Sequence, residues 1–539
     1  MRTRLALVAC AVLSAGALTL ADTYPQNPDI DIQHYVFALT LTDASDEIAG
    51  EATIDVRFVR GGVAEFSLDL IGRSAERGSQ GMTVAAVRDG GVALPFQHAG
   101  DRVRIRLHAP AAAGDHRRIT IVYQGTPADG LVISKNRHGE RTFFGDNFPD
   151  RARHWLPTVD HPADKATCEF IVTAPDRYRV IATGLKVEES DLPGGGRLTH
   201  WRTAVPVSTY NMVLGAARFA VQYADRMDGV SIETWAYPQD RDGWFRAFAV
   251  ARRVAEFYAF RIGPYAYEKL ANVESRTRFG GMENAGNIFY TEKLGVERGA
   301  EGIAAHEIAH QWFGGSVTES DWHHAWLSEG FATYLTHLYN EFTYGRDRLT
   351  SGLQDDRRGV IEYARKHPDL RVVDPRLPEN RVLSTYTYQK GGWVLHMLRR
   401  KIGDEMFWAG IREYYRKYRD GTALSDDLRD VMETASGMEL DGFFQQWLYE
   451  PGHPKLRLTW AYDAPANVLS VTVDQTQSGR PFSVDLDLGI TLADGARHIE
   501  TIELTGPSRS VTIPLDAAPV AVSMDPDTWL LAEFETTRR

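Results

Sequence analysis

Apolar and polar residues alternate in several stretches of the first 221 residues. Three stretches share a period of two: Tyr35 to Leu41, Ala52 to Phe58, and Val103 to Leu107 between arginines. This period is typical of β-strands that bury one face. Pro193-Gly194-Gly195-Gly196 has the composition of a turn between two further strands. We therefore expect a β-rich N-terminal domain over residues 22–221.

The period then changes to that of a helix. Ala247, Val250, Val254 and Phe257 fall on one helical face, and Gly263-Pro264 ends the run. Residues 222–453 are expected to form a mixed α/β, then mainly helical, domain.

After Pro454 the period returns to two. Phe482, Val484, Leu486, Leu488 and Ile490 alternate with Ser483, Asp485, Asp487 and Gly489. This pattern predicts a small β-sandwich over residues 454–539. The predicted fold class is multidomain α+β.

The first 21 residues have the pattern of an export signal. Arg2 and Arg4 precede the apolar stretch Leu5 to Leu20, and small residues for cleavage follow. Leu7 to Cys10 resembles a lipoprotein cleavage box, but that reading leaves too short an apolar region. We expect a cleaved signal peptide at 1–21, a periplasmic or secreted protein, and no membrane span in the mature form, because no other stretch approaches 20 apolar residues.

Charge and cysteine content narrow the function classes. The 539 residues carry a formal charge of −12, and no run of Lys and Arg suggests a nucleic-acid partner. With Cys10 removed, Cys168 is the sole thiol, so no intrachain disulfide is expected. Cys168 is expected to be a buried apolar residue.

Candidate chemistry appears at His306-Glu307-Ile308-Ala309-His310. Positions i and i+4 of a helix share one face, so both histidines can reach one metal ion. Because a chain with 17 His can contain such a pattern by accident, a third ligand is required. Glu329 stands at the start of a helical run through Phe331, Leu335 and Leu338. Two His and one Glu with an open fourth position are typical of catalytic zinc.

These motifs resemble those of the M1 family of zinc aminopeptidases. The spacing from His310 to Glu329 is similar to the family's, Gly280-Gly281-Met282-Glu283-Asn284 resembles its G-x-M-E-N motif, and Tyr388-Gln389-Lys390-Gly391 resembles the segment around its catalytic tyrosine. All three occur in the family's order. The resemblance extends to Trp447 to Pro454, where the family's catalytic domain closes.

The resemblance implies an architecture and a cofactor. It implies an N-terminal β-saddle and a thermolysin-like catalytic domain that binds one zinc ion per chain through His306, His310 and Glu329. Many relatives continue into a large helical domain. We expect no such domain here, and therefore a more open approach to the cleft.

The chemistry of peptide hydrolysis assigns further roles. Zinc lowers the pKa of water and polarises the scissile carbonyl. Glu307 would take the proton of that water and pass it to the leaving amine. By resemblance, Tyr388 would stabilise the oxyanion, with Tyr386 as the fallback.

The G-x-M-E-N segment predicts an exopeptidase. Glu283 would bind the positively charged α-amine of the substrate, and Gly280 and Gly281 would leave room for its backbone. Met282 and Asn284 belong to the same substrate-binding segment. For Phe279 two roles remain open: it lines the first side-chain pocket, or it is an aromatic residue of the core.

One element of the family pattern is absent. Relatives usually place a second amine-binding Glu or Gln where this chain has Phe148. Asp146 or Asn147 would have to serve instead.

The expected function is therefore release of N-terminal residues from peptides that have a free N-terminus. Two alternatives remain open from the sequence: a relative that opens a lipid epoxide with the same zinc, and a peptide-binding pseudo-enzyme. The intact set of His306, Glu307, His310, Glu329 and Tyr388 argues against the pseudo-enzyme.

Overall fold

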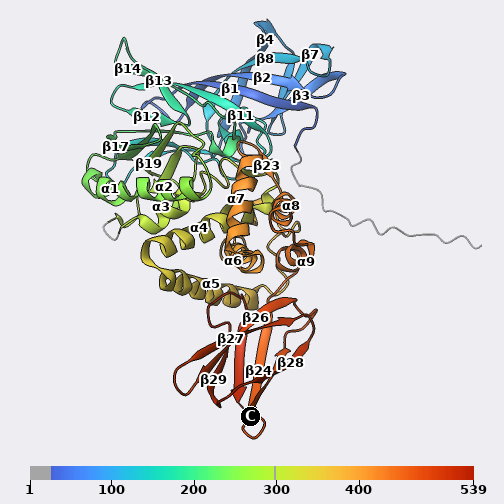
Figure 1. Ribbon diagram of the computed structural model, residues 1–539. Helices are drawn as coiled ribbons and strands as arrows, with labels where there is room; N and C mark the ends of the chain where they lie inside the picture. Colours follow the sequence, from blue (N-terminus) through green and yellow to red (C-terminus); the bar gives the residue numbers. More distant parts are fainter. Residues whose placement is uncertain (1–25, 297–298, 539) are drawn as a thin grey trace, which may run out of the picture.

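The computed structural model describes residues 26–296 and 299–538. The expected signal peptide at 1–21 lies outside these ranges. The N-terminal strands lie at one end of the molecule, the C-terminal strands at the other, and most of the helices between them (Figure 1). No helix among the described residues is long and apolar enough to cross a membrane.

The N-terminal region is built almost entirely of strands. A nine-stranded sheet has the order β13-β14-β11-β1-β2-β8-β4-β5, with β15 paired to β11; a four-stranded sheet has the order β12-β16-β10-β9, and a three-stranded sheet the order β3-β7-β6. The strand bounds are β1 Ile30–Thr40, β2 Ile48–Phe58, β3 Val63–Asp69, β4 Gly81–Asp89, β5 Val92–Ala93, β6 Phe96–Ala99, β7 Arg102–Ala111, β8 His116–Thr126, β9 Leu131–Lys135, β10 Arg141–Gly145, β11 Lys165–Pro175, β12 Arg179–Ala182, β13 Leu185–Leu192, β14 Gly196–Arg202, β15 Val207–Ser208 and β16 Leu214–Ala217.

The alternating stretches of the sequence are confirmed as strands with one buried face. Tyr35 and Phe37 in β1 and Ile54 and Val56 in β2 are fully buried. The turn expected at 193–196 joins β13 and β14. Cys168 is buried in β11, as expected.

The central region combines a sheet with helices. Its five-stranded sheet has the order β17-β18-β19-β21-β20. Strand β17 spans the boundary expected between residues 221 and 222. The bounds are β17 Ala220–Met227, β18 Val230–Ala236, α1 Arg241–Ala247, α2 Ala251–Arg261, β19 Lys269–Ser275, β20 Gly281–Met282, β21 Asn287–Thr291, α3 Glu301–Ala309, β22 Thr318–Glu319, α4 Trp326–Tyr344, α5 Arg346–Lys366, α6 Gly391–Ile402, α7 Asp404–Tyr418, β23 Thr422–Ala423, α8 Ser425–Ser436 and α9 Asp441–Phe444.

The helical run expected from Ala247 to Phe257 is interrupted. A 3-10 turn at Phe248–Val250 separates α1 from α2. Two π-helical segments, Tyr386–Lys390 and Gln445–Tyr449, also lie in this region. The hydrophobic period does not distinguish these variants from a continuous α-helix, because the spacings of their apolar residues nearly coincide.

The C-terminal region consists of two sheets, with orders β28-β25-β24-β30 and β27-β26-β29. The bounds are β24 Lys455–Asp463, β25 Val468–Gln475, β26 Val484–Leu492, β27 Arg497–Leu504, β28 Ser508–Pro514, β29 Pro519–Met524 and β30 Glu533–Arg538. Asp487 in β26 was expected to face solvent, but it is 6% exposed. The reason is an ion pair with Arg400 of α6, which packs against this part of the chain.

Candidate active site

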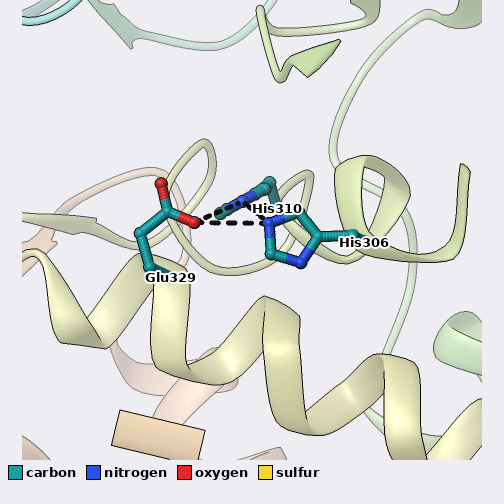
Figure 2. A group of neighbouring side chains, drawn as sticks. All are labelled: His306, His310 and Glu329. Atoms are coloured by element: carbon teal, nitrogen blue, oxygen red, sulfur yellow. Dashed lines mark hydrogen bonds and ion pairs between the residues drawn. The ribbon is translucent and has the colours of Figure 1, made fainter. Parts of the chain in front are cut away.

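Three ligand atoms converge between α3 and α4. The Nε2 atom of His306 and that of His310 each lie 3.3 Å from Oε2 of Glu329, and the two Nε2 atoms are 3.2 Å apart (Figure 2). A zinc ion with tetrahedral ligands at 2.0–2.1 Å would hold those ligands about 3.3 Å apart. The triangle therefore fits one metal ion, and Glu329 Oε2 has no hydrogen-bond donor among the described residues.

The ring of His310 is oriented by atoms on its far side. Its Nδ1 lies 3.2 Å from the carbonyl oxygen of Phe313 and 3.0 Å from Oγ of Ser328. Such contacts fix the tautomer that leaves Nε2 free to bind a metal. The sequence analysis did not identify Ser328, although its position beside Glu329 was a usable signal.

Glu329 is positioned by close contact between two helices. It lies in the first turn of α4, directly before Gly330. A Cβ added at Gly330 would lie 2.9 Å from the carbonyl carbon of Gly391, and one at Gly391 would lie 3.1 Å from Cα of Gly330. Any larger side chain would push the helices apart, so these glycines set the distance between α4 and the start of α6.

Tyr388 reaches the same site from the π-helix that precedes α6. Its ring stacks on that of His306, with centroids 6.0 Å apart and an angle of 11°. Burial is the main effect that raises the pKa of Tyr388, and the negative charges of Glu329 and the other nearby carboxylates raise it further. The phenol therefore stays protonated and can donate a hydrogen bond. Tyr386, the fallback, is fully buried and packs against Tyr363 instead.

Glu307 lies on α3 against the glycine motif. A Cβ at Gly281 would approach Oε1 of Glu307 to 2.2 Å, whereas one at Gly280 would have ordinary contact with Ile303 at 3.6 Å. We expected both glycines to make room for a substrate backbone; Gly281 makes room for Glu307.

Burial also sets the protonation of Glu307. Burial is the main effect that raises the pKa of Glu307 to about 8. The charge of His310 lowers this pKa, and the carboxylates of Glu283 and Glu329 raise it. A bound cation would lower the pKa again, so Glu307 has the properties of a base that works near neutral pH.

Glu283 lines the same pocket, and one ligand atom each of Glu283, Glu307 and His310 lie within 4.8 Å of one another. The side chain of Glu283 is buried, and burial raises its pKa, an effect that His310 partly offsets. A buried carboxylate gains from a cationic partner, and an α-ammonium group is such a partner. Strand β20, which precedes Glu283, is the edge strand of its sheet, so its outer side can pair with an extended peptide.

The two proposed substitutes for the missing second anchor are wrong. Asp146 is fully buried and binds the guanidinium of Arg151 at 2.7 Å, and Asn147 hydrogen-bonds Trp155 and backbone carbonyls. Both side chains are therefore occupied in holding the loop. Phe148 lines the pocket instead.

The pocket has a volume of about 240 Å³. It is lined by Phe148, Phe279, Gly280, Gly281, Met282, Glu283, Ile303, His306, Glu307, His310, Glu329, Leu383 and Tyr388. Phe279 lines it, in agreement with the first of its two expected roles. Asn284 does not; it is fully buried behind the pocket.

Two lining residues were not identified from the sequence. Ile303 lies three positions before His306, on the same helical face, and this spacing was a usable signal. Leu383 lies in an irregular segment, where the sequence offers no such signal.

Comparisons with known proteins agree with this geometry. Residues 32–211 match the Peptidase M1 N-terminal domain, and residues 247–447 match the Peptidase family M1 domain. Together the two matches cover most of the chain.

Curated relatives and solved structures are similar to the chain. Tricorn protease-interacting factor F2 of Thermoplasma volcanium is 30% identical over 355 residues, which are 61% of this chain and 43% of the relative. Leucyl aminopeptidase of Saccharolobus solfataricus is 28% identical over 367 residues, 64% of this chain and 44% of the relative. A crystal structure of a mutant M1 zinc metallopeptidase from Deinococcus radiodurans has a TM-score of 0.64 and 25% identity, and the match covers 78% of this chain and 95% of that one.

The chain spans less than half of the length of the two curated relatives named above, 43% and 44%. The shared part nevertheless contains both M1 domain types, and the donor set of the metal triangle fits the zinc that this family implies. The chain belongs to peptidase family M1.

Proposed function

We propose that the protein is a zinc-dependent aminopeptidase that releases N-terminal residues from peptides. The observation that carries this proposal is a single pocket that is lined both by the metal triangle and by the buried carboxylate of Glu283. A peptide bound by its amine at Glu283 would present its first peptide bond to the metal triangle. The aminopeptidase names of several relatives support the same conclusion.

The proposed zinc site uses His306, His310 and Glu329, with one ion per chain. When bound there, zinc would acidify a water molecule and polarise the scissile carbonyl. Replacement of Glu329 by Ala removes one of three protein ligands and should lower both zinc content and turnover. Full zinc occupancy in Glu329→Ala, measured by atomic absorption, would refute the ligand assignment.

The side chains of the chain itself would move the protons. Glu307 accepts a proton from the attacking water and then donates it to the nitrogen of the leaving peptide. Because Gly281 has no Cβ, it leaves room beside it for the carboxyl group of Glu307. Tyr388 donates its phenolic proton to the developing oxyanion.

The rest of the pocket suggests which first residue fits. Phe148, Phe279 and Leu383 form an apolar wall, and Phe148 is held edge-on against Phe279 and Trp322. An apolar first side chain gains from contact with this wall, whereas a charged one would lose its hydration without a partner. We propose that apolar N-terminal residues are preferred.

A panel of fluorogenic aminoacyl substrates with matched N-acetylated controls tests the proposal. Free aminoacyl substrates should be cleaved, acetylated ones poorly, and a chelator should abolish the activity until zinc is restored. Equal cleavage of free and acetylated substrates would indicate an endopeptidase. Hydrolysis of a lipid epoxide without peptide cleavage would favour the first alternative, and zinc binding without turnover the pseudo-enzyme; the comparisons support neither.

Two further expectations remain proposals. The basic start and apolar stretch of the first 21 residues support export to the periplasm or secretion, which N-terminal sequencing of the mature protein would test. The two C-terminal sheets support a β-sandwich that follows the catalytic domain.

A further inference from the structure

The segment of residues 313–316 follows His310 and contacts the side of its ring that faces away from the metal triangle. The carbonyl oxygen of Phe313 lies 3.2 Å from Nδ1 of His310. A Cβ added at Gly314 would lie 3.2 Å from the same nitrogen and 2.3 Å from Oγ of Ser328, in the first turn of α4. A displacement of the 313–316 segment would therefore be felt at both helices that carry metal ligands.

Two side chains of the N-terminal region bind this segment. Nζ of Lys165, the first residue of β11, donates to the carbonyl oxygens of Gly315 at 3.0 Å and Ser316 at 2.7 Å. The hydroxyl of Tyr210 donates to the carbonyl oxygen of Gly314 at 2.8 Å. Three consecutive carbonyl groups beside the metal site thus accept hydrogen bonds from a different region of the chain.

The surroundings of Lys165 favour this arrangement. The residue is only partly buried, but its ammonium group is shielded from water, and this desolvation lowers the pKa of Lys165 to about 7, while the charges of Asp420 and Glu319 raise it. A desolvated polar group is costly unless it is hydrogen-bonded, and the two carbonyl oxygens provide those bonds. The side chain therefore gains by staying on the 313–316 segment.

The 313–316 segment is also bound within the central region. The hydroxyl of Thr318 donates to the carbonyl oxygens of Gly314 at 2.6 Å and Gly315 at 2.9 Å, and Oγ of Ser316 donates to Asp420 at 3.0 Å. A carbonyl oxygen has two lone pairs, so these bonds and those from the N-terminal region coexist. Loss of one N-terminal donor should consequently shift the segment without unfolding it.

We propose that Lys165 and Tyr210 are positioning residues of the metal site, through which the N-terminal region keeps His310 in the orientation that binds zinc. Neither side chain is among those that line the pocket, so both act through the 313–316 segment. Partners that orient a metal ligand from outside typically contribute about 10- to 100-fold to metal affinity. The inference rests on the zinc site of the proposed function, but it does not require peptide cleavage.

Release of zinc from the loaded full-length chain to a chromogenic chelator tests the proposal. Lys165→Met keeps the length of the side chain and removes the donor, so zinc should leave about tenfold faster or more. The visible absorption spectrum of the Co²⁺-substituted variant should also differ from that of the parent chain, because the orientation of a ligand has changed. Tyr210→Phe keeps the aromatic ring and should accelerate zinc release to a smaller extent.

Lys269→Met is the matched control. Nζ of Lys269, on β19, donates to the carbonyl oxygens of Ala182 at 2.9 Å and Gly184 at 2.5 Å, so this lysine also joins the central region to the N-terminal region through two backbone carbonyls. Burial lowers its pKa to about 8, much as for Lys165. Its partners do not belong to the 313–316 segment. Lys269→Met should therefore lose a similar amount of thermal stability and yet release zinc at the parental rate.

Two results would refute the proposal. One is a parental rate of zinc release in both Lys165→Met and Tyr210→Phe. The other is an equal acceleration in Lys165→Met and Lys269→Met, because the effect would then reflect lost stability alone. If Lys165→Met does not fold, the rate in Tyr210→Phe decides. A parent chain that holds zinc but cleaves no peptide would refute only the proposed function, and one that binds no zinc would refute both.

Discussion

The two ends of the catalytic pocket differ in how they are built. The metal end consists of His306 and His310 from α3 and its C-terminus and of Glu329 from the first turn of α4, two neighbouring helices. The amine end combines Glu283, which directly follows the edge strand β20, with Phe148 from a loop of the N-terminal region. At the metal end, the positions of the ligands follow from the spacing of residues along neighbouring helices. At the amine end, substrate recognition depends on how two segments that are distant in the sequence pack together.

This difference predicts a gradient of mutational effects from the metal end to the amine end. The largest loss should follow Glu307→Gln, which keeps the size of the side chain and removes the base. Turnover should fall by about 10²–10⁴-fold, because general acid–base catalysis contributes that much. Metal analysis should show normal zinc content; a loss of zinc would mean that Glu307 holds the metal rather than moving the proton.

Tyr388→Phe should produce the next largest loss. Removal of the phenolic hydroxyl leaves the stacking on His306 intact but removes one oxyanion donor, so kcat should fall by about 10²–10³-fold with little change in KM. Steady-state kinetics measures both constants. Tyr386→Phe is the control; a collapse of turnover in that variant alone would reverse the two assignments.

Gly281→Ala tests whether the space that Gly281 leaves for the carboxyl group of Glu307 is required for turnover. The added methyl would overlap the carboxyl group of Glu307, and a displacement of about 1 Å can cost about 10²-fold in turnover. Gly280→Ala, whose Cβ would have ordinary contact with Ile303, should retain near-normal kcat. Equal activity of the two variants would show that Glu307 can move freely.

At the amine end, Glu283→Ala should lower kcat/KM for aminoacyl substrates by about 10- to 100-fold, because a charge-assisted hydrogen bond to the ammonium group is lost. The discrimination against acetylated substrates should decrease with it. Glu256→Ala, on the exposed side of α2, is the control. Unchanged discrimination would place amine recognition elsewhere.

The smallest effect is expected for Phe148→Leu. A smaller side chain leaves the wall apolar but widens it, so the ratio of kcat/KM for large over small aminoacyl substrates should rise by about three- to tenfold. Phe260→Leu, at an exposed position, is the matched control. An unchanged ratio would remove Phe148 from the determinants of substrate size.

The sequence predicted most of the metal end and little of the amine end, for a physical reason. His306, Glu307 and His310 are related by the pitch of one helix, and Glu329 begins the next amphipathic helix, so local periodicity identified all four. The role of Phe148 depended on which atoms bind Asp146 and Asn147. Some of those partners, such as Met212 and Arg278, lie far away in the sequence. Tyr388 was chosen over Tyr386 by resemblance alone.

The fold shows the same limit. Alternation identified the strands, because a sheet with one buried face forces a period of two on its sequence. It did not predict the burial of Asp487, since that depends on Arg400 from another region. The local pattern also did not predict the order of strands within each sheet. That order arises from pairings between strands that are far apart in the sequence, such as β1 with β11.

The contact between Gly330 and Gly391 has a consequence for the design of variants. Since Glu329 precedes one glycine and Tyr388 lies three residues before the other, the metal ligand and the phenol are carried by two helices that touch backbone to backbone. To graft this site into another scaffold, the first turns of both helices would therefore have to be transferred together, in their present relative positions. Transfer of the side chains alone would lose the registration between them.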